Sequence, residues 1–383
     1  MAAFLLSAWK GGLQTLLDDL FETLTGQTAR VVTKSAVSQA RQKLKASAFE
    51  ALNAQLLTAL EHHWPEPRWQ GLRLVAADAT TLRLPNTPDN QAEFGAQTDP
   101  VGQTFVAAKV LGLYSTVSGR MLKTVLAGYR SAERALLMPV LAQLNVDDLL
   151  ILDRGYPAAW LFAAFGQCNR HFLSRIDGAQ WPEVQAFAQG EAVEQIVTRP
   201  VTAESQRSAR ALGIEGLPDT VTYRLIRVRQ PNGKQQLLAT SLLDSQRYPA
   251  HDFAELYHQR WGIEEAFKVL KHRLMIEQFS GESPEAIRQD VHAKTFTANL
   301  AKAMTYPVEQ ETPGQEAGKR YRPNLTYALA RLRYRLFGWL LQKIEPDQVL
   351  ALLDLIARTQ ERQRPGRSSL RHKTQPKPRR QYK

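Results

Sequence analysis

Two aspartates in this sequence each end a run of apolar residues. Asp78 follows the stretch Leu-Val-Ala-Ala, and Asp153 follows the stretch Leu-Leu-Ile-Leu. A carboxylate that closes a buried strand must be hydrogen-bonded, paired or metal-bound, because burying it alone is costly in free energy. Taken alone, Asp78 is explained slightly better as a cap of the turn that follows it. Because α/β sheets gather their ligands at the carboxyl ends of strands, two acids so placed favour one shared site.

A third acid, Glu264, lies in a segment whose spacing predicts a single helix. In YHQRWGIEEAFKVLK, Tyr257, Arg260, Glu264 and Lys271 follow one another at intervals of three, four and seven residues. With about 3.6 residues per turn, their side chains fall within an arc of about 60°. The adjoining face is apolar and carries Leu256, Ile263, Phe267, Leu270 and Leu274. Such a face should pack on a sheet, which would place Glu264 at the edge of the core, toward the two aspartates.

A simpler explanation covers two of these charges. Arg260 and Glu264 can form an i,i+4 ion pair, which contributes only about 0.2–0.5 kcal/mol. It does not explain why Tyr257 and Lys271 share the same face. Glu265 points about 100° away from Glu264 and is expected to be a surface acid.

Three carboxylates of this kind suit the cleavage of phosphodiesters. Mg²⁺ prefers hard oxygen ligands, and two ions about 3.5–4 Å apart can activate a nucleophile and stabilise the leaving oxygen. Arg260 and Lys271 could hold the phosphate without competing for metal. The eight histidines form no HExxH pattern, and the single cysteine, Cys168, excludes an internal disulfide or a cysteine-rich zinc site.

The composition is that of a large, basic, globular protein. Its 383 residues predict two or three folded units, and 44% hydrophobic residues can bury a large core. Lys and Arg outnumber Asp and Glu by 49 to 37, and the net charge of +12 favours a partner such as nucleic acid or a membrane surface. No apolar run is long enough to span a bilayer and no signal peptide is evident, so we expect a soluble, cytoplasmic protein.

The hydrophobic pattern predicts the elements that must position the three acids. Strands are expected at 72–85, 105–115, 121–128, within 147–157 and at 171–176, with helices at 133–144 and from Pro157 onward. Three strands followed by alternating helix and strand describe a mixed α/β sheet. The block 177–250 is β-rich, contains a hairpin with an Asn-Gly turn, and is interpreted as interrupting the α/β unit rather than extending it.

The remaining segments are helical, apart from the C-terminal tail. Helices are expected at 9–24, 36–44, 49–60, 252–274, 283–304, 324–342 and 346–362. The N-terminal helices form either a helix-turn-helix element for DNA binding or a plain helical bundle. The tail after Glu361 carries nine Lys and Arg residues and no acid, so we expect it to be disordered and to contact nucleic acid rather than only to aid solubility.

These motifs together resemble those of a known family. The YHQRWGIEEAFKVLK segment matches the Y-x2-R-x3-E-x6-K motif of the IS-four family of bacterial DDE transposases at all four positions. Asp78 in DATTLRLP and Asp153 in LLILDRGYP are similar to the two aspartate motifs of that family, in the expected order. The resemblance covers roughly residues 70–305. It implies an RNase H-like catalytic domain with a β-rich insertion between the second aspartate and the glutamate.

The resemblance also implies roles for individual residues. Asp78, Asp153 and Glu264 would be the catalytic and metal-binding triad, holding two Mg²⁺ ions for which Mn²⁺ can substitute. DNA contacts would come from Tyr257, Arg260, Trp261 and Lys271, although a tryptophan at this place is more often a core residue. The implied partners are double-stranded DNA, at transposon ends and target, and a second copy of the chain in a homodimer on DNA, within the nucleoid of a bacterial cytoplasm.

The fold class expected is therefore α/β: an RNase H-like mixed sheet with a β-rich insertion, plus N- and C-terminal helical regions. The expected domains are 1–69 (helical), 70–176 with 251–305 (catalytic), 177–250 (insertion), 306–361 (C-terminal helices) and 362–383 (basic tail). Three functions remain open: an active transposase, a related or domesticated nuclease, and a DNA-binding repressor with a vestigial triad. The three intact acids argue against the repressor. Terminal inverted repeats beside the gene would separate the first two.

Overall fold

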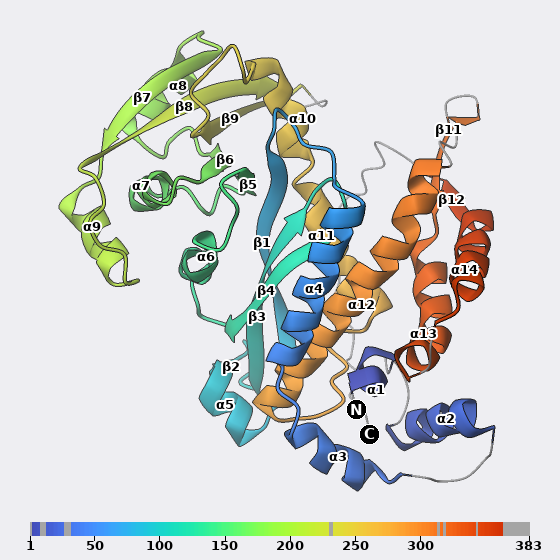
Figure 1. Ribbon diagram of the computed structural model, residues 1–383. Coiled ribbons are helices and arrows are strands. Elements are labelled where there is room, and N and C mark those ends of the chain that lie inside the picture. The colour runs from blue at the N-terminus through green and yellow to red at the C-terminus, as the bar shows by residue number, and fades with distance from the viewer. Residues whose placement is uncertain are drawn as a thin grey trace. The chain divides into compact units, whose positions relative to one another are not determined.

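The computed structural model of the chain describes residues 2–7, 13–26, 32–229, 233–311, 315–316, 319–341 and 344–362 (Figure 1). The chain divides into two compact units, each assembled from separate stretches. The sheet unit consists of Trp64–Leu82 and Ala107–Phe267, and the helical unit consists of Met1–His63, Arg83–Val106 and Lys268–Lys383. The predicted basic tail, apart from Arg362, lies outside the described residues.

A mixed nine-stranded sheet has the order β2-β3-β1-β5-β6-β9-β8-β7, with β4 paired to β3. Its strands are β1 (Arg73–Leu84), β2 (Ala96–Thr98), β3 (Thr104–Ser115), β4 (Met121–Gly128), β5 (Asp148–Leu152), β6 (His171–Ile176), β7 (Glu194–Pro200), β8 (Thr220–Arg229) and β9 (Gln235–Thr240). β1, β5 and β6 are parallel neighbours, whereas β3 and β4 are antiparallel. The expected mixed α/β sheet is confirmed.

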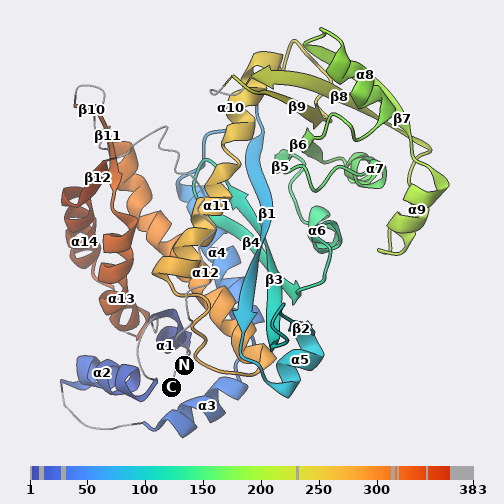
Figure 2. The same ribbon diagram turned by 180° about the vertical axis from the view of Figure 1, so that it is seen from behind.

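Helices pack on both faces of this sheet (Figure 2). Those of the sheet unit are α6 (Glu133–Leu141), α7 (Ala159–Gln167), α8 (Pro182–Gln189), α9 (Ala203–Arg210), α10 (Phe253–His258) and α11 (Trp261–Lys268). Within β5, Leu150 and Leu152 share a core with α6 and α7, while Leu149 and Ile151 share a core with α10. Successive side chains of a strand point to opposite faces of the sheet. A central strand that is covered on both faces therefore needs apolar residues at consecutive positions.

The block 177–250 joins the same sheet, so the interpretation that it only interrupts the α/β unit is wrong. β9 pairs antiparallel with β6, and β8 and β7 continue the sheet outward. Without β9, the outer edge of β6 would present unpaired N–H and C=O groups. The predicted hairpin of β8 and β9 is confirmed; Gly233 in its turn has a φ of 79°, while Asn232 lies outside the described residues. The helices α8 and α9 were not predicted.

The motif segment is not one continuous helix, as its spacing had predicted. α10 ends at His258, α11 begins at Trp261, and a π-helical turn, Val269–Arg273, follows. At the break the backbone N–H groups bond three residues back, as from Arg260 to the Tyr257 carbonyl at 3.2 Å. A Cβ on Gly262 would lie 2.9 Å from the Tyr114 ring, so this close packing requires glycine. The single 60° arc therefore does not hold for all four motif residues.

The helical unit contains most of the other predicted helices. Its helices are α1 (Ala2–Ser7), α2 (Leu13–Thr25), α3 (Lys34–Gln42), α4 (Ser47–His63), α5 (Pro88–Phe94), α12 (Pro284–Glu311), α13 (Leu325–Leu341) and α14 (Pro346–Arg358), with short strands β10 (Gln315–Glu316), β11 (Lys319–Pro323) and β12 (Gln360–Arg362). Of these, α1 and α5 were not predicted. Arg41, one of the basic residues of α3, is buried and donates to Asp290 at 2.9 Å. It attaches α3 to α12 instead of serving a DNA-binding face. Among the described helices, none has the length and apolar character needed to cross a bilayer.

Candidate active site

Asp78 lies within β1 and Asp153 directly follows β5, its parallel neighbour, at the same level of the sheet. In the register of β1 and β5, Ala76 stands beside Ile151, and each aspartate comes two residues later. Two residues along a strand return to the same face, which is the face that α10 covers through Leu149 and Ile151. The register agrees with the expectation that neighbouring strands bring the two acids to one level, but only Asp153 follows a strand end, because β1 continues past Asp78 to Leu84.

Asp78 is mostly buried and is held by two contacts. Its Oδ1 accepts from the backbone N–H of Ala79 at 2.8 Å, and its Oδ2 lies 3.3 Å from Nη1 of Arg260. Burial raises the pKa of the Asp78 carboxyl to about 6, and the nearby charge of Asp153 adds to that effect, although Ala79 and Arg260 oppose it. Desolvation of the carboxylate thus outweighs the stabilisation that Arg260 provides.

Arg260 links two of the three acids. Its Nη1 contacts Asp78, and its Nη2 lies 3.2 Å from Oε1 of Glu264. The Arg260 side chain is only 8% exposed, so this is not the surface ion pair that the spacing alone allowed. Arg260 lies between the end of α10 and the start of α11, where it contacts a carboxylate from β1 as well as one from α11.

Asp153 begins a tight loop after β5. Its Oδ1 accepts from the backbone N–H of Gly155 at 2.8 Å. Its backbone carbonyl accepts from the Ser174 hydroxyl at 3.2 Å and from the N–H of Tyr156 at 3.3 Å. Each aspartate thus accepts a nearby backbone N–H with one carboxylate oxygen, within β1 for Asp78 and in the loop for Asp153, which leaves the second oxygen of each for other partners.

The predicted DNA contacts differ in their surroundings. Tyr257 is 6% exposed and belongs to the core beneath α10, where burial raises its pKa. Trp261 is 48% exposed beside the Arg260 guanidinium, with 5.3 Å from Arg260 Cζ to the ring centre, so it is not a core residue. Lys271 lies in the π-helical turn that belongs to the helical unit.

Comparison with known proteins assigns the chain to a family. The family described as Transposase DDE domain matches residues 69–300, which is more than half of the chain. The chain belongs to the DDE transposase family. The transposase InsG for insertion sequence element IS4, from Escherichia coli K12, is 26% identical over 289 residues. That match covers 74% of this chain and 63% of the length of InsG.

A solved structure is also similar in part. The cryo-EM structure of a piggyBac transposase synaptic complex with hairpin DNA aligns with 96% of this chain and 77% of that chain, with a TM-score of 0.42 and 10% identity.

The carboxylates of this DDE family member fit a divalent metal by their chemistry. Members of the family use divalent metal ions. Within the described ranges, no three His, Cys, Asp or Glu side chains are gathered closely enough to hold one. Asp78 and Glu264 are instead joined by the Arg260 guanidinium, and Asp78 has a raised pKa. Carboxylate oxygens are hard ligands that suit a divalent cation such as Mg²⁺, which would replace Arg260 as their counter-ion.

Three residues close to this site were missed by the sequence reasoning. The charges of Asp153 and Glu133 both raise the pKa of Asp78, and Glu133 also lies 3.8 Å from Lys109. Arg134 donates to the loop after Asp153. Arg175, exposed on β6, follows Ser174, the register partner of Leu152. The available signals were the Glu-Arg pair that opens a helix and an arginine near the end of an otherwise apolar strand.

The raised pKa of Asp78 predicts a measurable stability effect. The folded state binds this proton more tightly than the unfolded state, so the stability that Asp78 contributes is complete below about pH 4 and is lost as pH rises through about 6. In chelator-containing buffer at pH 7.5, Asp78→Asn should raise the free energy of unfolding by about 2 kcal/mol, because the amide carries no charge to desolvate.

Urea unfolding from pH 4 to pH 8 tests this expectation. The difference in the free energy of unfolding between Asp78→Asn and wild type should shrink toward zero near pH 4. Glu265→Gln, at an exposed acid in α11, serves as the matched control and should track wild type throughout. A difference between Asp78→Asn and wild type that does not change with pH would contradict the assignment.

Proposed function

We propose that this protein is a DNA transposase that cuts the ends of its element and joins them to target DNA. In this proposal Asp78, Asp153 and Glu264 hold two Mg²⁺ ions, with Mn²⁺ as a substitute. The supporting observation is the placement of two aspartates at one level and on one face of adjacent parallel strands, with Glu264 connected to Asp78 through Arg260. Membership of the DDE transposase family points to the same chemistry.

The residues of the chain would prepare the site before DNA arrives. Ala79 and Gly155 fix one oxygen of each aspartate by backbone hydrogen bonds, so the carboxylates need little reordering to bind a cation. Arg260 balances Asp78 and Glu264 while the site lacks other cations. Bound divalent ions would activate the attacking oxygen and stabilise the leaving one. Once released from the carboxylates, Arg260 could hold a phosphate of the DNA.

The proposed DNA contacts are Tyr257, Arg260, Trp261 and Lys271. Exposed Trp261 has a face that can stack on an unpaired base, and stacking of this kind contributes about 1–3 kcal/mol. Tyr257 is nearly buried, with its ring centre 5.9 Å from Arg260 Cζ, so it would act chiefly by supporting that arginine. The net charge of +12 favours a polyanion, and the proposal includes a homodimer that brings two DNA ends together.

The function is tested with DNA from both flanks of the gene. Labelled duplexes covering each flank are incubated with the protein and Mg²⁺, Mn²⁺ or chelator, and strand breaks and joined products are resolved on a denaturing gel. Cleavage at inverted repeats with joining to a second duplex supports a transposase. Cleavage without joining indicates the related nuclease, and binding without any metal-dependent cleavage indicates the repressor.

Lys271 provides a separate test of DNA contact. We expect Lys271→Ala to weaken binding to the flank duplex and to reduce the slope of log K against log salt by about one unit, since one phosphate contact is lost. Fluorescence anisotropy between 50 and 300 mM KCl, roughly the range over which such slopes are resolved, measures both. Lys234→Ala, a lysine next to the β8–β9 turn, is the control. An unchanged slope for Lys271→Ala would remove it from the contacts.

A further inference from the structure

The start of α6 is tied to the loop that carries Asp153. Both Nε and Nη2 of Arg134 donate to the backbone carbonyl of Gly155, at 3.1 and 2.8 Å. Two donors on one acceptor hold the Gly155 peptide more firmly than a single bond would, because a guanidinium presents its N–H groups in a fixed fork. Burial lowers the pKa of Arg134, but the charge of Asp153 opposes that effect, which places the two side chains within electrostatic reach.

The same glycine also contacts the Asp153 carboxylate. The N–H of Gly155 donates to Oδ1 of Asp153 at 2.8 Å, so Arg134, Gly155 and Asp153 form a continuous series of contacts. Among the described residues, Oδ2 of Asp153 has no hydrogen-bond partner. If the carboxylate rotated away from Gly155, Oδ1 would lose its hydrogen bond to the loop and Oδ2 would no longer be held in its present position.

The identity of residue 155 fits this contact. A Cβ built on Gly155 would lie 3.1 Å from Oδ1 of Asp153, closer than most Cβ atoms approach any neighbour. Gly155 does not have a positive φ, so the requirement is for space beside the carboxylate and not for an unusual backbone conformation. An alanine here would press on the carboxylate without disturbing the strand.

Other contacts hold the loop as a whole. The Asp153 carbonyl accepts from Ser174, and Tyr156 is fully buried in the main core. α6 is anchored independently by apolar residues, including the buried Leu137 and Leu141. Loss of Arg134 should therefore change the orientation of the Gly155 peptide and of the Asp153 carboxylate more than it changes the stability of the fold.

We propose that Arg134 is a positioning residue, which holds the Gly155 carbonyl and thereby keeps the second oxygen of Asp153 available to a divalent cation. This inference rests on the proposed function, since it gives Asp153 a metal to bind. Residues that orient metal ligands in this way typically change metal affinity by about 10–100-fold when they are replaced.

The test measures metal binding by the full-length protein as well as catalysis. Mn²⁺ is titrated into protein without DNA by isothermal calorimetry, for wild type, Arg134→Ala, Arg134→Lys and Gly155→Ala. We expect Arg134→Ala to weaken Mn²⁺ binding about tenfold or more, with a melting temperature close to wild type. Arg134→Lys, which can still donate to Gly155, should recover part of the Mn²⁺ affinity. Gly155→Ala should bind Mn²⁺ more weakly than wild type.

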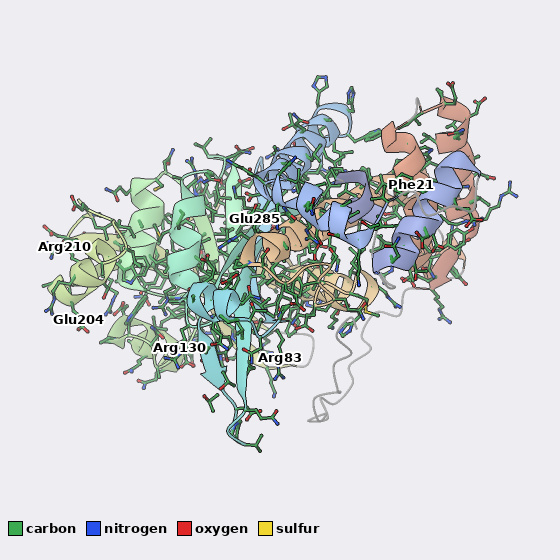
Figure 3. All side chains as sticks on the ribbon, turned by 90° about the horizontal axis from the view of Figure 1, so that it is seen from below. Phe21, Arg83, Arg130, Glu204, Arg210 and Glu285 are labelled. Carbon is green, nitrogen blue, oxygen red and sulfur yellow. The ribbon has the colours of Figure 1, made fainter. Side chains whose placement is uncertain are left out.

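A matched control separates position from charge. Arg207→Ala removes an exposed arginine from α9, the helix that carries Glu204 and Arg210 in Figure 3, and should bind Mn²⁺ as wild type does. Wild-type Mn²⁺ affinity in folded Arg134→Ala, or absence of any Mn²⁺ binding by the wild type, overturns the proposal. If Arg134→Ala does not fold, Gly155→Ala provides the test, and wild-type Mn²⁺ affinity in Gly155→Ala also overturns the proposal. A wild type that binds Mn²⁺ but cuts no flank duplex refutes the transposase function while leaving the Arg134 comparison valid.

Discussion

Asp78→Asn, Asp153→Asn and Glu264→Gln are each expected to reduce Mg²⁺-dependent cleavage of the flank duplex by about a thousandfold or more. The proposed metal ions stabilise charge that develops during cleavage, and loss of several kcal/mol of that stabilisation corresponds to this factor. The amides keep the size of each side chain, and their oxygens can still accept a hydrogen bond. Single-turnover cleavage rates measured across a range of Mg²⁺ concentrations give the effect.

DNA binding separates a catalytic defect from a structural one. The three variants should bind the flank duplex within about threefold of wild type, since no lost carboxylate is a phosphate contact. Glu265→Gln is the matched control, because this acid is adjacent to Glu264 and exposed, and it should cleave normally. Full activity in any one of the three variants would discredit that residue as part of the triad.

Arg260→Ala is expected to destabilise the metal-free protein by about 2–4 kcal/mol at pH 7.5. Removal of this cation leaves Asp78 and Glu264 without their shared partner, and uncompensated carboxylates in a mostly buried place are costly. Urea unfolding in the presence of chelator measures the loss. Arg260→Lys should recover only part of it, because an ammonium group cannot place two separated N–H donors in one plane.

The pH dependence and the Mg²⁺ dependence of stability identify why Arg260→Ala is destabilised. The defect in Arg260→Ala should become smaller as pH falls toward about 6, because loss of the guanidinium raises the pKa of Asp78 further and protonation of Asp78 removes the unbalanced charge. Mg²⁺ should stabilise Arg260→Ala more than it stabilises wild type, because a bound cation takes over the role of the guanidinium. Equal Mg²⁺ stabilisation of both proteins would show that Arg260 and metal do not share these carboxylates.

The strands of the catalytic region could be predicted from sequence because the way a strand is buried determines which of its positions are apolar. The stretch before Asp153 is apolar at every position, as a strand covered on both faces must be. The same argument placed Asp153 correctly at a strand end, but Asp78 lies within β1, which continues to Leu84. The short helices α8 and α9 could not be predicted, since each has only eight residues and makes little periodic pattern.

The geometry of the motif segment was harder to predict, for a physical reason. A projection at 3.6 residues per turn assumes uniform helix geometry, and the chain departs from it where Gly262 packs against Tyr114. Gly262 was visible in the sequence, but its ring neighbour comes from β3. The contact of Arg260 with Asp78 and that of Arg134 with Gly155 likewise join distant segments, so spacing within one segment could not reveal them.

The antiparallel pairing of β9 with β6 has a consequence for how this region can vary. The block between Asp153 and Glu264 is joined to the catalytic strands by main-chain bonds, which any sequence can make provided that it supplies an extended segment in the right place. Shortening or swapping the block is therefore compatible with the scaffold only when a replacement strand remains beside His171–Ile176. Beyond that one strand, its hairpin and helices are open to change, which makes the outer part of the block the natural place for diversification.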